Sequence, residues 1–120
     1  MKSLVAVVTP VYNGEDTIEK SILSLISQTF DNWISIIIND GSSDNTKEIL
    51  RKYEDDERFL IIHLAENKGR GYARNLGLLK IKELGVPYMC MLDADDWYAE
   101  HKLDLQFRLC LLYTSPSPRD

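Results

Sequence analysis

The sequence contains little cysteine, no long apolar run and no excess of positive charge. Its two cysteines, Cys90 and Cys110, form no disulfide framework. Cys90 falls in an apolar stretch, which is typical of a small buried thiol in a reducing compartment. No stretch approaches the roughly 20 apolar residues of a transmembrane helix, and the apolar start is too short for a secretory signal. We therefore expect a cytoplasmic location, with attachment to the inner face of a membrane arising only through regions outside this sequence.

The charge balance argues against a general nucleic-acid-binding or membrane-binding surface. There are 14 basic and 19 acidic residues, which gives a net charge of −5. A general nucleic-acid-binding or anionic-membrane-binding surface needs the opposite balance, although a local basic pocket is compatible with it. With 120 residues the chain is at most one domain.

Apolar runs alternate with helical patterns along the chain. Short apolar runs predict strands over residues 4–9, 34–39, 59–63 and 88–92. Between them, periodic apolar residues predict helices over about 16–28, 45–55 and 72–84, the first with Asp16 as its N-cap and Glu19 completing a capping box, the last stopping at Gly85. This alternation predicts an α/β fold with a mostly parallel sheet.

Acidic residues follow two of the predicted strands. Asp40 ends the second strand, and Asp93, Asp95 and Asp96 follow the fourth. Ligands of open α/β sheets bind at the carboxyl ends of the strands. Carboxylates gathered there repel one another unless a cation holds them. A divalent metal carrying a diphosphate fits such a site.

Five segments together resemble the family-2 inverting glycosyltransferases, which have the GT-A fold. They are VTPVYNGE (8–15), SLISQT (24–29), NDGSSDNT (39–46), ENKGRGYARNLG (66–77) and LDADD (92–96). Each is a weak signal alone, but the order and spacing are those of the family, over residues 3–105. The resemblance implies a Rossmann-like nucleotide-diphospho-sugar transferase fold, truncated here, and a hexosyltransferase-type enzyme. It also implies transfer with inversion from a nucleotide-diphosphate sugar, usually a uridine diphosphate (UDP) sugar, to a saccharide or lipid-linked acceptor in bacterial surface polysaccharide or glycolipid synthesis.

The resemblance also implies which residues bind the donor and the metal. Asp93 would face the ribose and Asp95 would bind Mn²⁺ or Mg²⁺ as part of a DXD motif, with Asp96 orienting Asp95. Asp40 would accept a hydrogen bond from a uracil imide N–H, and Tyr12 would stack on the base. The remaining nucleotide-sugar residues would be Thr9, Pro10, Glu15, Lys68, Gly69 and Arg74.

Simpler interpretations remain open for several of these residues. Pro10 and the Asn13-Gly14 pair are also typical of a plain turn. Asp40 also suits a helix cap, whereas a calcium loop fails because its sixth position is Asn45 rather than glycine. Lys68 and Arg70 also read as solvated surface charges, the favoured interpretation of Arg70.

The chain carries no identifiable catalytic base. Inverting transfer needs a group that deprotonates the acceptor hydroxyl, and the family supplies it from the second half of the domain. We therefore expect a donor-binding and metal-binding part that is inactive alone. One alternative is a non-catalytic nucleotide-binding fragment. Another is a haloacid-dehalogenase-like phosphatase, which also uses Asp-x-Asp but has Thr or Val where this chain has Trp97. A third is a sugar nucleotidyltransferase, but this chain lacks the glycine-rich basic first loop of that class.

The last eleven residues differ in character from the rest. Residues 110–120, CLLYTSPSPRD, resemble a translated adapter sequence from DNA library preparation, and a Ser/Pro-rich linker is the alternative. We therefore expect residues 1–109 to be the N-terminal part of a glycosyltransferase 2-like domain and residues 110–120 to be an artefactual tail.

Overall fold

A computed structural model describes residues 4–105 of the chain. The predicted tail and domain boundary at residues 109 and 110 lie outside the described residues. Strands and helices alternate in seven elements: β1 (Val5–Val11), α1 (Ile18–Ile26), β2 (Trp33–Asn39), α2 (Thr46–Arg51), β3 (Phe59–His63), α3 (Arg70–Leu84) and β4 (Tyr88–Met91). Within the described part, no helix combines the length and apolar character needed to span a membrane.

The four strands form one parallel sheet in the order β3-β2-β1-β4. β1 is central, and its Val5 pairs with Trp33 of β2 on one side and Tyr88 of β4 on the other. The parallel α/β architecture predicted from the alternating pattern is therefore confirmed. Because all strands run the same way, their carboxyl ends meet at one edge of the sheet.

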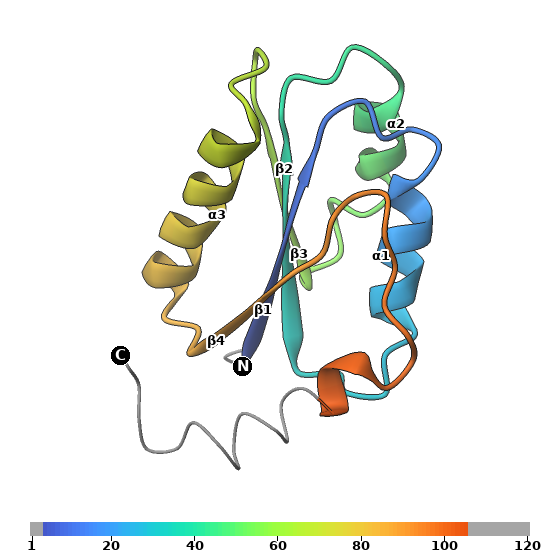
Figure 1. The fold of residues 1–120 in the computed structure, drawn as a ribbon, viewed down its shortest axis with the longest axis vertical. Coiled ribbons are helices and arrows are strands. Elements are labelled where there is room, and N and C mark those ends of the chain that lie inside the picture. Colours follow the sequence, from blue (N-terminus) through green and yellow to red (C-terminus); the bar gives the residue numbers. More distant parts are fainter. Residues whose placement is uncertain (1–3, 106–120) are drawn as a thin grey trace.

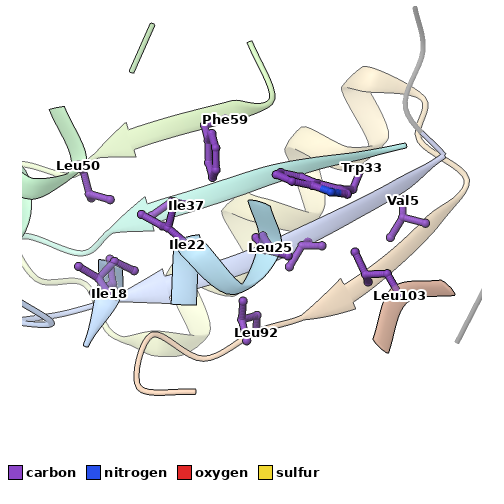
Figure 2. Packing of buried hydrophobic residues seen from close by; sticks show 12 residues of the cluster. Val5, Ile18, Ile22, Leu25, Trp33, Ile37, Leu50, Phe59, Leu92 and Leu103 are labelled. Atoms are coloured by element: carbon purple, nitrogen blue, oxygen red, sulfur yellow. The ribbon is translucent and has the colours of Figure 1, made fainter. Parts of the chain in front are cut away.

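Helices cover both faces of the sheet. Figure 1 shows α3 on one face and α1 with α2 on the other. All seven residues of β1 are buried, as expected for a strand covered on both sides. The core on the α1 side, seen in Figure 2, also receives Leu92 and Leu103 from the chain after β4, so this late segment is packed onto the domain.

Helix boundaries differ from the sequence prediction, most clearly at the start of α1 and the end of α2. The capping box of Asp16 and Glu19 is wrong, because Thr17 occupies the N-cap without a side-chain cap bond. Glu19 instead accepts hydrogen bonds of 2.6 Å from Lys52 Nζ and from the Tyr53 hydroxyl. α2 ends at Arg51, earlier than predicted, because the following backbone bonds tighten to i→i+3 turns. The predicted stop of α3 at Gly85 is confirmed by its left-handed φ of 71°.

Candidate functional site

A cleft of about 630 Å³ opens at the carboxyl edge of the sheet. Loops that follow β1, β2, β3 and β4 all contribute to its walls. Asp40 and Asp93 both line it, so the acidic residues of two separate strands converge as predicted from the topology. The lining residues are Pro10, Val11, Tyr12, Asn13, Gly14, Asp16, Thr17, Asp40, Asn67, Gly69, Arg70, Asp93, Ala94 and Asp95.

Asp40 is buried and holds the loop that follows β3. Its Oδ1 accepts a hydrogen bond from the backbone N–H of Lys68 at 2.7 Å, and its Oδ2 accepts one from that of Gly69 at 3.0 Å. The side-chain amide of Asn67 donates to Oδ2 at 3.1 Å. Three donors on one carboxylate compensate the cost of burying its charge. Asp40 therefore fixes the entrance to α3 beside the cleft.

The loops after β1 and β2 are fastened to each other, in contacts that we call the loop brace (residues 12–15 with 42–46). Asn13 adopts a left-handed φ of 52°, and its Oδ1 accepts the backbone N–H of Ser43 at 2.8 Å. The backbone N–H of Gly14 donates to Thr46 Oγ1 at 2.9 Å, and that of Glu15 donates to Asp44 Oδ2 at 3.1 Å. The brace holds Tyr12 and Asp40 on one rigid wall of the cleft.

A glycine allows the Asp40 turn to approach the loop after β3. Gly41 has a φ of +67°, and a Cβ there would lie 2.3 Å from the backbone carbonyl carbon of Glu66. Both the conformation and the close approach therefore require glycine. The Asp-Gly pair at the end of β2 thus serves loop packing as well as the placement of a carboxylate.

Three carboxylates gather in the loop after β4, which we call the acidic loop (residues 93–96). Ligand oxygens of Asp93, Asp95 and Asp96 all lie within 4.8 Å of one another. The backbone N–H of Asp96 donates to the carbonyl of Asp93 at 3.0 Å, which closes the loop as a turn. Asp95 and Asp96 are exposed and Asp93 is half-buried. A set of carboxylate oxygens open to solvent fits Mg²⁺ or Mn²⁺, which prefer oxygen ligands and retain bound waters.

Arg70 connects the start of α3 to the acidic loop. Its guanidinium donates to Asp93 Oδ1 in an exposed ion pair. This hydrogen bond, with the negative charges of Asp93 and Asp95, raises the pKa of Arg70 above its ordinary value. The interpretation of Arg70 as a solvated surface charge agrees with its 64% exposed side chain, and the structure adds its ion pair with Asp93. Among the lining residues that the structure describes, Arg70 is the one cation, and it contacts a carboxylate of the acidic loop.

The cleft gathers six of the ten predicted site residues. Pro10, Tyr12, Asp40, Gly69, Asp93 and Asp95 line it together. Thr9 is buried within β1, and Arg74 is exposed on α3. Glu15 accepts the backbone N–H of Asn45 at 2.9 Å, and Lys68 pairs with Glu66 at 3.1 Å. These four do not line the cleft, and the binding roles of all ten stay predictions.

The sequence reasoning missed several lining residues. Arg70, Asn67, Asp16 and Thr17 reach the cleft without having been assigned to the site. For Arg70 and Asn67 a signal existed, because both lie within two residues of Gly69 at a helix N-terminus. Asp16 was assigned to a helix cap instead, and nothing in the sequence pointed to Thr17.

Aromatic residues follow the acidic loop. Trp97 is 56% exposed, and Lys20 Nζ of α1 lies 3.7 Å from the centroid of its ring. The hydroxyl of Tyr98 donates to the carbonyl of Met91. Burial, with lesser contributions from nearby Cys90, Asp93 and Asp96, raises the pKa of Tyr98 well above its ordinary value. Tyr98 packs against the core, whereas Trp97 stays largely at the surface.

The fold and the acidic cleft define a class, and solved structures with the same architecture identify it as the GT-A fold. The structure of Staphylococcus aureus TarS residues 1–349 in complex with UDP superimposes with a TM-score of 0.80 at 27% identity, over 94% of this chain and 33% of that one. The mannosyltransferase PcManGT of Pyrobaculum calidifontis, solved with GDP-Man and Mn²⁺, gives a TM-score of 0.77 at 21% identity, over 95% and 34% of the two chains. That second likeness concerns the fold alone.

The chain belongs to glycosyl transferase family 2, whose family model matches residues 6–109. TuaG of Bacillus subtilis (strain 168), a glycosyltransferase provisionally assigned by name to teichuronic acid biosynthesis, is 39% identical over 111 residues. WfgD of Escherichia coli, named as a UDP-Glc:α-D-GlcNAc-diphosphoundecaprenol β-1,3-glucosyltransferase, is 35% identical over 108 residues. The alignments cover 92% and 90% of this chain but only 43% and 41% of TuaG and WfgD. The chain therefore spans less than half the length of these relatives.

Proposed function

We propose that this chain carries the donor site and metal site of a hexosyltransferase-type enzyme. The enzyme would transfer a sugar with inversion from a UDP-sugar to a saccharide or lipid-linked acceptor, in bacterial surface polysaccharide or glycolipid synthesis. The observation that carries the proposal is that Tyr12, Asp40, Asp93 and Asp95 line one cleft. A phosphatase or a sugar nucleotidyltransferase finds no support in the family match or in the named relatives.

Similar proteins support the choice of donor. TarS was solved with UDP and also with UDP-GlcNAc, at 27% and 28% identity to this chain. The name of WfgD specifies a UDP-glucose donor and a lipid-linked diphosphate acceptor. We carry the uridine diphosphate over to this chain, and we leave the sugar and the acceptor at the level of their chemical class.

The nucleotide would bind along the wall fixed by the loop brace. Tyr12 is 53% exposed and lines the cleft, so its ring is available to stack on a base. Asp40 Oδ1 accepts one hydrogen bond, from Lys68, and a carboxylate oxygen has room for about two. The second acceptor position suits the imide N–H of uracil. The same carboxylate would thus hold the 67–69 loop and accept a hydrogen bond from the base.

The acidic loop would hold the metal. Asp95 is the proposed ligand, with Asp96 and Asp93 supplying neighbouring oxygens. A bound Mn²⁺ or Mg²⁺ would neutralise the charge that develops on the departing diphosphate. Arg70 adds a permanent cation at the same end of the cleft, where it can exchange Asp93 for a phosphate oxygen.

The proposal assigns no catalytic base within these residues, so the chain alone should not transfer sugar. The length of the relatives supports this, since more than half of TuaG and WfgD has no counterpart here. We further propose that the full-length enzyme works in the cytoplasm, where nucleotide sugars are available, with any membrane association arising through regions outside this chain. A donor-consumption assay with a panel of UDP-sugars tests the expected inactivity of the chain alone. Robust transfer by this chain would show that the catalytic base lies within these residues.

Titration calorimetry with UDP tests the donor and metal assignments. Asp95→Ala should abolish the Mn²⁺-dependent part of UDP binding, whereas Asp40→Ala should weaken binding with or without the metal. Asp55→Ala, which removes an exposed carboxylate outside the cleft, is the matched control and should bind as the wild type does. Equal Mn²⁺-dependent binding by the wild type and Asp95→Ala would refute the metal assignment.

A further inference from the structure

Three polar side chains on one face of α1 and the turn after it contact the segment that contains the acidic loop. Ser21, Ser24 and Gln28 are spaced three and four residues apart, which places them on the same side of a helix. Ser21 and Gln28 are buried, although both are polar. Each of the three bonds to residues more than 70 positions away in sequence. Figure 1 shows this late segment, in orange, running back alongside α1.

Ser21 is the member nearest the proposed metal site. Its hydroxyl lies 3.0 Å from the carbonyl oxygen of Ala94 and 3.4 Å from that of Asp93, and it also contacts the carbonyl of Asp96. Three carbonyl oxygens of the acidic loop thus lie around one buried hydroxyl. The same residues, 93 and 96, carry carboxylates of the candidate metal cluster.

Ser24 and Gln28 fasten the rest of the segment. Ser24 Oγ accepts the backbone N–H of Tyr98 at 3.1 Å. The side chain of Gln28 donates to the carbonyl of Ala99 at 2.6 Å and accepts the backbone N–H of Leu103 at 2.9 Å. The spacing of the three side chains on α1 and the turn after it therefore matches the path of residues 93–103 and holds that segment alongside the helix.

The acidic loop needs such an anchor for an electrostatic reason. Three carboxylates within 4.8 Å repel one another, and Arg70 pairs with only one of them. Repulsion of this kind spreads a loop unless its backbone is held. The Ser21 hydroxyl has one hydrogen to donate to these three carbonyl oxygens, and its removal would leave that part of the loop without its donor.

We propose that Ser21 is a positioning residue that sets the spacing of the acidic loop for a divalent cation. The proposal rests on the proposed function, since the cation is the one assigned there to Asp95. Ser21 itself would contact neither the cation nor the nucleotide-sugar donor. It acts through the backbone of Asp93, Ala94 and Asp96, while Ser24 and Gln28 keep the following segment in place.

Mn²⁺ titration followed by electron paramagnetic resonance tests the proposal on the 120-residue chain. Ser21→Ala should weaken Mn²⁺ binding by about fivefold or more, the equivalent of one lost hydrogen bond, and leave UDP binding without metal unchanged. Ser35→Ala is the matched control, because Ser35 is a buried serine whose hydroxyl has no hydrogen-bond partner within residues 4–105. It should bind Mn²⁺ as the wild type does. Ser21→Cys, with a weak donor of similar size, should fall between wild type and Ser21→Ala.

Equal Mn²⁺ affinity in the wild type and Ser21→Ala would overturn the proposal, as would an equal loss in Ser35→Ala. Amide hydrogen exchange provides a readout that needs no metal. Residues 93–99 should exchange faster in Ser21→Ala, and the strands should not. If the wild type binds no Mn²⁺, the proposed metal site fails. Amide exchange then tests only whether Ser21 positions the loop. Faster exchange confined to residues 93–99 in Ser21→Ala supports that role, and unchanged exchange refutes it.

Discussion

The carboxylate of Asp40 accepts the backbone N–H of Lys68 at 2.7 Å across 28 residues of sequence. This bond joins the end of β2 to the loop before α3, and the same loop delivers Arg70 to Asp93. Asp40 is therefore at once a lining residue of the cleft and the support of its opposite wall. Changes at Asp40 should affect stability and ligand binding together.

Asp40→Asn should destabilise the fold by about 2–4 kcal/mol, because a buried carboxylate that accepts three donors is replaced by a group with one acceptor oxygen and an amide that repels N–H donors. Urea unfolding measures this loss. The control Asp55→Asn removes an exposed carboxylate and should stay within about 0.5 kcal/mol of the wild type. A neutral Asp40→Asn would show that the 67–69 loop is held by other contacts.

Arg70→Gln should change the affinities of the cleft for Mn²⁺ and for UDP in opposite directions. The substitution leaves Asp93 without its exposed cation, so Mn²⁺ alone should bind about two- to fivefold more tightly, as expected for a surface ion pair. UDP in the presence of Mn²⁺ should bind more weakly, because a phosphate partner is lost. Both shifts should shrink in high salt. Weaker binding of Mn²⁺ alone would contradict the proposed competition for Asp93.

Acid should weaken the loop brace through Asp44. Burial opposes ionisation of this carboxyl, but hydrogen bonds from the side chain and backbone of Thr46 and from the backbone of Glu15 outweigh it and lower the pKa of Asp44. A carboxyl with a lower pKa in the folded state adds stability above its unfolded pKa of about 3.9, and this contribution disappears as the pH falls through the folded pKa. Asp44→Asn should therefore be less stable at pH 7 and lose less stability below about pH 4. Urea unfolding at stepped pH checks this, and parallel curves for the two proteins would refute it.

The elements that the sequence predicted best are the buried strands, because a short apolar run is by itself enough to indicate them. The all-apolar centres of β1 and β2 predicted strands covered on both faces, and parallel topology then brought Asp40 and Asp93 to one edge. The prediction needed no knowledge of individual side-chain contacts, because strand direction alone determines where the carboxyl ends lie.

Contacts between distant segments escaped the sequence analysis. Glu15 was assigned to the donor, yet its carboxylate meets the backbone of Asn45 across 30 residues. Glu19 was assigned to a helix cap, yet it binds Lys52 and Tyr53. Local spacing suggested the cap, and tertiary partners that no local pattern encodes overrode it. The ion pair of Arg70 with Asp93 was missed for the same reason, since the two residues lie 23 positions apart. The donor role of Glu15 came from the family resemblance and stays a prediction.

Ser35→Ala should be neutral or stabilising by up to about 1 kcal/mol. The hydroxyl of Ser35 is buried in β2 and has no hydrogen-bond partner among the described residues, so its removal relieves a desolvation cost. Thermal and urea unfolding measure the change. Ser21→Ala, which removes a bonded hydroxyl of equal burial, should be destabilising in the same assays. A loss of more than about 1 kcal/mol for Ser35→Ala would indicate a bonded hydroxyl.

The outer edge of β4 should promote self-association of the isolated chain. Within residues 4–105 this strand pairs only with β1, and it exposes 39% of Met89 and 37% of Met91. An unpaired strand edge with apolar side chains is a template for a second chain. Met91→Lys should therefore lower the fraction of dimer and larger species in sedimentation velocity experiments. Leu23→Lys, which removes a 50% exposed apolar side chain from α1 instead, is the control and should associate as the wild type does. If both variants reduced association equally, general surface hydrophobicity rather than the β4 edge would be the cause.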